Sequence, residues 1–175
     1  MKTILIIIGM LILTPAFSQP GNLTRDQAYK TYSNFVGGKW EAKGKWKNGS
    51  DYHQEIIVET ELTKNIFTVK TQDYIDSKQF DNSRRNYGVR AWDDKEKKMK
   101  FWEFNVFGGI VTGEIIFDGN NIYHVYQYPL KSGETKLLAD AWIYINKDTY
   151  TFKIAEFNEG KLGKEYMSST FNRKS

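Results

Sequence analysis

Residues 38–47 read GKWEAKGKWK, and their side chains alternate between two kinds. One set of alternate positions holds Trp40, Ala42, Gly44 and Trp46, and the other holds Glu41, Lys43, Lys45 and Lys47. Successive side chains of a β-strand point to opposite faces of a sheet. This pattern therefore predicts a strand with one buried face and one face in water.

The same alternation returns further along the chain. Its expected inward positions are Tyr52, Gln54, Ile56, Val58 and Thr60, then Phe67, Val69 and Thr71, and near the C-terminus Tyr150, Phe152 and Ile154. Two middle segments, 101–104 and 137–142, are apolar on both faces. The outer sides of these two segments are either covered by a helix or lie where a strand bends across a barrel, and the sequence leaves both options open.

Residues 24–36 predict a single short helix ahead of the sheet. Thr24 and Gln27 have the spacing of a capping box, and the pair Gly37-Gly38 ends the segment. Turn signals then recur at intervals of about 10 to 15 residues. They are Asn48-Gly49-Ser50, Thr63-Lys64-Asn65, residues 76–83, 93–98, Gly108-Gly109, Asp118-Gly119-Asn120, Lys131-Ser132-Gly133, Asn146-Lys147-Asp148 and Asn158-Glu159-Gly160.

Strand-like segments fill the intervals between these turns. Consecutive strands joined by short turns form an antiparallel meander, and a long meander usually closes because closure removes its edges. The predicted fold class is therefore all-β: a single antiparallel meander barrel of about eight to ten strands with a short N-terminal helix.

Composition excludes several classes of site. The 175 residues include no cysteine and two histidines, so disulfides and thiolate chemistry are ruled out and no metal site is expected. The formal net charge is +4, and together with the export signal described next it predicts that nucleic acid is not a partner. Phosphate-binding loops, dinucleotide fingerprints and nucleophile elbows do not occur in the sequence.

The first 18 residues have the features of a secretory signal peptide. Lys2 precedes the apolar run 4–13, and Ala16 and Ser18 precede a predicted cleavage before Gln19. A membrane-spanning helix needs about 20 apolar residues, so this run is too short to act as one. The expected organisation is a signal peptide over 1–18 and one barrel domain over 19–175. The mature chain is expected to be periplasmic or secreted and not embedded in a membrane.

The start and end of the predicted barrel resemble the calycin superfamily of lipocalins and fatty-acid-binding proteins. In that group a glycine-x-tryptophan opens the first strand, and an arginine from the last strands packs on the indole. Gly38, Trp40 and Arg173 match these positions and imply that the barrel closes there. The resemblance also predicts that the Arg173 guanidinium lies over the Trp40 ring and donates to backbone carbonyls at the helix–strand junction.

The segment 88–102 further resembles the bacterial lipocalin-like domains of unknown function called DUF1579. Nitrobindins open in a similar way and bind haem through a histidine near the C-terminus. This chain has no histidine after His124, so no cofactor is expected.

Several polar and aromatic side chains are candidates for the lining of a ligand cavity. They are Gln54, Arg90, Trp102, Glu103, Glu114, His124, Tyr126 and Tyr128. Glu103 shares a face with Phe101, and Glu114 shares one with Ile116, so we expect both carboxylates inside. A one-residue bulge at Gly108 or Gly113 would reverse this assignment. The plainer interpretation is that these groups satisfy one another or face water.

The predicted function is an exported binder of a small, largely apolar molecule, with no catalysis assigned. One alternative is an isomerase or hydrolase that uses Glu103 or Glu114 with Tyr126. Another is a carbohydrate or surface interaction module that uses tryptophans at the rim. His53 alternates with Glu55 on the charged face and is expected to face solvent. The oligomeric state is not predicted.

Overall fold

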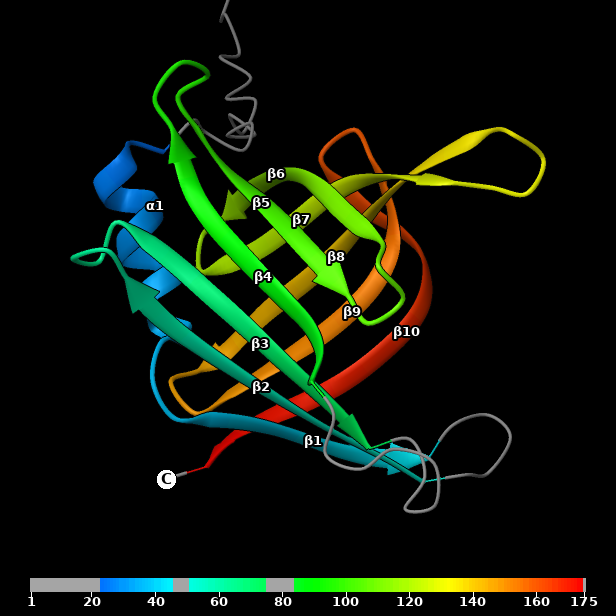
Figure 1. Cartoon of the computed structure of the whole chain (residues 1–175), viewed down its shortest axis with the longest axis horizontal. Coiled ribbons are helices and arrows are strands. Elements are labelled where there is room, and N and C mark those ends of the chain that lie inside the picture. The colour runs from blue at the N-terminus through cyan, green and yellow to red at the C-terminus, as the bar shows by residue number, and fades with distance from the viewer. Residues whose placement is uncertain (1–22, 46–50, 75–83, 175) are drawn as a thin grey trace, which may run out of the picture.

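The computed structural model describes residues 23–45, 51–74 and 84–174. Their strands form one closed barrel in the order β1-β10-β9-β8-β7-β6-β5-β4-β3-β2, with every neighbouring pair antiparallel (Figure 1). The strands are β1 (Lys39–Lys45), β2 (Asp51–Glu61), β3 (Ile66–Tyr74), β4 (Arg84–Asp93), β5 (Lys98–Asn105), β6 (Ile110–Asp118), β7 (Asn121–Pro129), β8 (Thr135–Asn146), β9 (Thr149–Asn158) and β10 (Lys161–Lys174). The predicted all-β meander barrel is confirmed.

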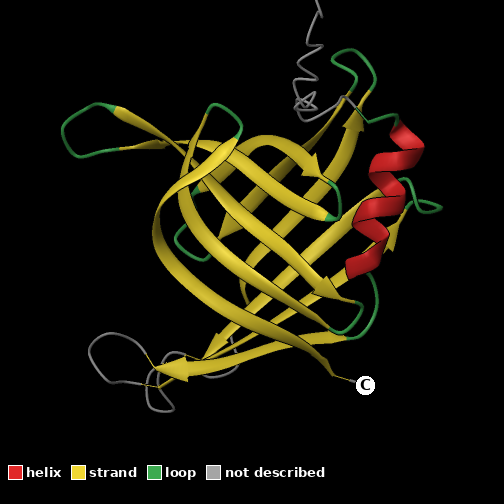
Figure 2. Ribbon diagram, turned by 180° about the vertical axis from the view of Figure 1, so that it is seen from behind, coloured by secondary structure: helices red, strands yellow, loops and turns green. Residues whose placement is uncertain are grey.

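The N-terminal helix lies against one end of this barrel (Figures 1 and 2). It consists of α1 (Arg25–Tyr32) and a 3-10 turn, η1 (Ser33–Phe35). The predicted capping box is present, because the Thr24 hydroxyl accepts from the Gln27 backbone and the Gln27 side chain accepts from the Thr24 backbone. Tyr32 and Phe35 are fully buried in the barrel core, so the helix plugs this end. Within the described residues, no helix has the length and apolar character to span a membrane.

Strand pairing fixes which side chains face the interior. Trp40 pairs with Ile56, and Val58 pairs with Val69, so the inward positions predicted for β1, β2 and β3 share one face. Tyr150 and Phe171 stack with their ring centroids 5.1 Å apart and extend the same core into β9 and β10. Trp46, which the first-strand pattern placed inside, lies outside the described residues.

The two segments that are apolar on both faces have different surroundings. In β5, Phe101 is buried inside while Trp102 is 37% exposed on the outside. In β8, Ala139 and Ala141 face outward and are fully buried beneath Tyr123 and its neighbours. The outer cover of β8 therefore comes from adjoining strands. This outer cluster comprises Tyr123, Val125, Ala139, Ala141 and Phe157.

The seam between β1 and β10 closes the barrel through a short ladder that includes Trp40 paired with Arg173. The Arg173 guanidinium carbon lies 4.1 Å from the centre of the Trp40 ring. Its nitrogens donate to the carbonyls of Asn34 at 2.7 Å and Val36 at 2.9 Å, at the helix–strand junction. Gly38 has φ of +71°, a conformation that favours glycine. The contact that the calycin resemblance implied is present.

Candidate functional site

An interior cavity of about 200 Å³ lies in the barrel core beyond the helix plug. Its apolar wall is made of Ile56, Val69, Phe101, Val111, Trp142, Phe152, Ile154, Met167 and Phe171. Its polar lining is made of Gln54, Thr71, Asn86, Arg90, Glu103, His124, Tyr126 and Asp140. Strands from both sides of the barrel contribute, so the cavity depends on closure of the whole sheet.

Arg90 and Glu103 form an ion pair at one wall, in which Arg90 is buried and Glu103 is partly buried. An Arg90 Nη atom lies 2.6 Å from a Glu103 carboxylate oxygen, and the Arg90 side chain is 3% exposed. The Asn86 amide donates to the other carboxylate oxygen at 3.0 Å. Gly88 makes room for this pair, since a β-carbon at Gly88 would lie 1.8 Å from Arg90 Nη1. The ion pair therefore depends on the absence of a side chain at position 88.

Asp140 and Tyr126 form a second polar pair, carried by β8 and β7. The Tyr126 hydroxyl donates to an Asp140 carboxylate oxygen at 3.0 Å. Burial, with a contribution from the Glu103 charge, raises the pKa of Asp140 to about 7. Burial also raises the pKa of Tyr126. Asp140 is therefore mostly protonated at mildly acidic pH and becomes charged around neutrality.

His124 connects the cavity to the helix plug. Its Nδ1 lies 3.1 Å from the Asp140 backbone carbonyl, which can only accept, so Nδ1 carries the proton. Nε2 then accepts from the Tyr32 hydroxyl at 3.2 Å. Burial, together with the nearby Arg90 charge, holds the pKa of His124 well below its usual value. The ring is thus neutral and fixed in one tautomer.

Five of the candidate cavity residues predicted from the sequence line this cavity. They are Gln54, Arg90, Glu103, His124 and Tyr126. For these five, the alternation within each strand and the pairing between strands agree on the inward face.

Three candidates lie elsewhere, and register explains each case. Phe101 pairs with Gly113, so Glu114 faces outward, where it forms an ion pair with Lys98 at 2.6 Å. Trp102 alternates with Phe101 and faces outward. Tyr128 lies beyond the last residue of β7 that pairs with β6 and is 49% exposed. The placement of Glu114, Trp102 and Tyr128 in the cavity was wrong.

Asp140 is the polar group that sequence reasoning missed. It stands in a segment, residues 137–142, whose other members are apolar. It is two residues from Trp142, so both point to the same face of β8. The sequence signal for Asp140 was a single acidic residue on the same strand face as a tryptophan expected in the core.

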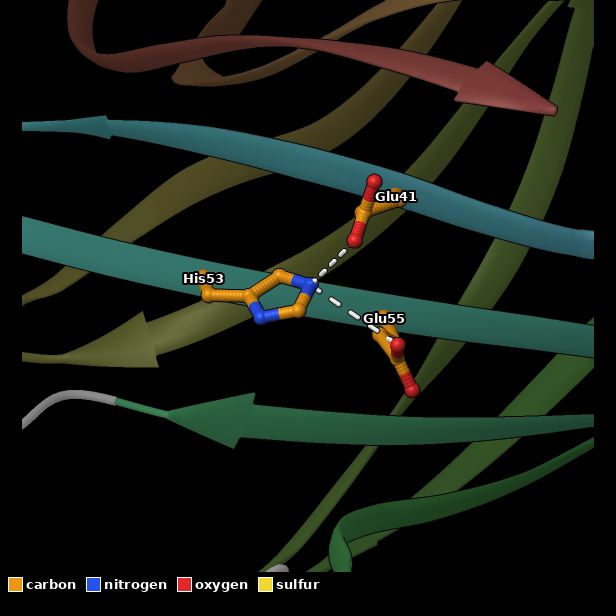
Figure 3. Close-up of side chains that lie close together, drawn as sticks. All are labelled: Glu41, His53 and Glu55. Carbon is orange, nitrogen blue, oxygen red and sulfur yellow. Dashed lines mark ion pairs between the residues drawn. The ribbon is translucent and has the colours of Figure 1, made fainter. Parts of the chain in front are cut away.

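A separate polar cluster lies on the outer face of β1 and β2 (Figure 3). His53 Nε2 lies 2.7 Å from a Glu41 oxygen and 3.7 Å from a Glu55 oxygen. Each of the three side chains offers one atom that could bind a metal ion, and these atoms lie within 4.8 Å of one another. His53 is partly exposed on the charged face, as its alternation indicated.

Lysines already neutralise the two carboxylates of this cluster. Lys43 and Lys174 contact Glu41 at 2.9 and 3.1 Å, and Lys39 contacts Glu55 at 2.9 Å. The neighbouring lysines hold the pKa of Glu41 down at about 2. Because a cation would have to displace three ammonium groups, we interpret the cluster as an ion-pair network between strands.

Comparison with known proteins finds structural likeness but no match in sequence. No protein-family model matches the chain, and no curated protein matches it. One solved structure that matches is described as the de novo design of a fluorescence-activating β-barrel. It has 11% sequence identity and a TM-score of 0.40, and the match covers 82% of this chain and 98% of the designed chain. The ten-strand antiparallel barrel fits a calycin-like fold.

Proposed function

We propose that the protein binds a small, largely apolar and uncharged molecule in the interior cavity. The observation that carries this proposal is a cavity of about 200 Å³ whose lining combines an aromatic and aliphatic wall with a polar side. Such a lining is typical of small-molecule sites, where apolar walls give affinity and polar groups fix orientation. A cavity of about 150 Å³ accommodates benzene, so the part of a ligand held here has about six to eight carbon atoms.

The charges around the cavity favour a neutral ligand. Arg90 is already paired with Glu103, His124 is neutral, and Asp140 is neutral or negative. An anionic group would therefore meet no unpaired positive charge among these residues. A hydroxyl or carbonyl group would instead find a hydrogen-bonding partner in the Tyr126–Asp140 pair.

Binding of 1-hexanol, followed by isothermal titration calorimetry, tests the proposal. We expect saturable one-to-one binding by the wild-type protein. Ile154→Trp fills the cavity and should weaken binding at least tenfold, whereas Lys153→Trp, on the opposite face of β9, should not. Thr71→Phe is a second blocking variant on another strand. Absence of saturable binding, or unchanged binding in folded blocked variants, would contradict the proposal.

The proposed setting is outside the cytoplasm, after cleavage of residues 1–18. The support is the positive residue, apolar run and small residues at −3 and −1 in the sequence. Intact mass measurement of protein recovered from the periplasm or medium should give a chain that begins at Gln19. A full-length mass would overturn this assignment. We also propose, from the resemblance of residues 88–102, that the protein is related to the DUF1579 domains.

One observation favours a second candidate function, proton transfer. Asp140 has a pKa of about 7 and lies beside Tyr126 in an apolar cavity, and a general acid or base works best when its pKa is near the operating pH. This would move the catalytic role from the predicted Glu103 or Glu114 to Asp140. Deuterium exchange next to the carbonyl of 2-hexanone, measured by NMR, should then fall in Asp140→Asn. Equal exchange in both proteins would contradict it.

A further inference from the structure

Strands β6 and β7 stop pairing with each other before either strand ends. Their ladder runs from Asp118 paired with Asn121 to Gly113 paired with Tyr126, and it stops there. Beyond that point β6 still pairs with β5 as far as residue 110, and β7 still pairs with β8 as far as residue 129. Residues 110–112 and 127–129 are therefore not joined by strand pairing, although the barrel as a whole is closed.

An outer groove of about 790 Å³ lies along these two segments. Its lining is mostly apolar, and the apolar members that do not also line the interior cavity include Ile110, Ile116, Val125, Pro129, Leu137 and Phe157. Val111 and Tyr126 line both this groove and the interior cavity. Tyr126 is also the residue of β7 at which the β6–β7 ladder ends, so the two spaces adjoin the same part of the barrel wall.

The groove exposes apolar surface that a soluble chain normally buries. Ile110 is 64% exposed, Tyr128 49% and Leu137 37%, and all three lie on the groove. Exposed apolar residues that gather at one recess mark a place where something apolar binds. Because this recess and the cavity share Val111 and Tyr126, the occupant that we consider for the recess is the remainder of a molecule held inside.

We propose that the cavity and the outer groove form one extended site for an uncharged amphiphile. Its hydroxyl or carbonyl head lies at Tyr126 and Asp140, and its hydrocarbon chain passes beside Val111 and continues along the groove. This inference rests on the proposed function and names the ligand class as neutral molecules longer than the cavity. The first six to eight carbons occupy the interior, and later carbons lie against Ile110 and Leu137.

Chain length gives a quantitative test. Each methylene moved from water to an apolar surface contributes about 0.8 kcal/mol, which is about fourfold in affinity. If the groove takes the chain, the affinity of 1-alkanols should keep rising from 1-hexanol to 1-decanol. If the cavity alone binds, the affinity should level off or fall once the cavity is full. We propose calorimetric titration of 1-hexanol, 1-octanol and 1-decanol, each below its solubility limit.

Variants of the groove test where the hydrocarbon chain of the ligand lies. The double variant Ile110→Ser with Leu137→Ser should weaken 1-decanol binding at least tenfold and leave 1-hexanol binding unchanged. Phe107→Ser is the matched control, because Phe107 is 87% exposed but does not line the groove. It should affect neither ligand. Equal 1-decanol affinity in the groove variant and the wild type would overturn the inference.

The remaining outcomes separate this inference from the proposed function. Binding of 1-hexanol with a plateau at 1-octanol supports the cavity and refutes the groove. Failure of every alkanol to bind refutes the proposed function itself. Decanoate at pH 8 should bind more weakly than 1-decanol, since the polar lining offers no unpaired cation, and tighter decanoate binding would overturn the neutral head group.

Discussion

Trp40 and Arg173 meet at the seam that closes the barrel. The Trp40 indole donates to the Phe35 carbonyl at 2.8 Å, and the Arg173 guanidinium lies over the same ring. We expect Trp40→Ala to cost roughly 3–5 kcal/mol, because a large buried ring is lost. Arg173→Ala should cost less, since a cation–π contact contributes about 0.5–2 kcal/mol. Urea unfolding of the double variant should show little further loss, and simple additivity would contradict coupling.

Gly88 is the second residue whose size governs a contact. Gly88→Ala would place a methyl group 1.8 Å from Arg90 Nη1 and push the guanidinium away from Glu103. Because Arg90 is buried and Glu103 only partly buried, we expect a clear loss in urea unfolding, smaller than the roughly 3–5 kcal/mol typical of a fully buried pair. Gly163→Ala is the control, because its nearest neighbour is an ordinary 3.5 Å contact. Similar small effects in both variants would show that Arg90 can move freely.

At the scale of one element, α1 depends on its N-terminal cap. Thr24 accepts a hydrogen bond from the Gln27 backbone, and the helix presents Tyr32 to the barrel core. Thr24→Ala should lower the free energy of unfolding by about 1 kcal/mol, and Thr24→Ser should restore most of it. Thermal melts of the three proteins would measure this. Equal stability of all three would mean that packing against the barrel holds the helix without its cap.

Strands were predictable where their own side chains distinguish the two faces. In β2, Gln54 and Ile56 stand on either side of the charged Glu55, and both line the cavity. In β6, Ile115 and Ile116 are consecutive, so its pattern fits either orientation. The face of Glu114 is set by pairing of β6 with β5, and the sequence of β6 does not contain that register. Local pattern therefore predicted the barrel, while part of the candidate site depended on contacts between strands.

At the scale of the whole molecule, two buried groups give the stability opposite pH dependences. The pKa of Asp140 is raised from 3.8 to about 7, so the folded protein holds a proton there that the unfolded chain has lost. That contribution is present at low pH and is lost as pH rises through about 7. The pKa of His124 is lowered well below 6.5, so folding excludes a proton that the unfolded chain would bind. That contribution is present above pH 6.5 and is lost as pH falls.

Below pH 6.5 the two slopes have opposite signs, so the free energy of unfolding of the wild type should change less with pH than in a variant that keeps only one of the two groups. In Asp140→Asn only the His124 contribution remains. The free energy of unfolding of this variant should fall as pH drops, with a slope that approaches about 1.4 kcal/mol per pH unit. In His124→Gln only the Asp140 contribution remains, so the free energy of unfolding of this variant should fall as pH rises. Urea titrations at half-unit pH intervals would measure both slopes. Slopes of the same sign in the two variants would mean that Asp140 and His124 do not titrate as the geometry of the cavity requires.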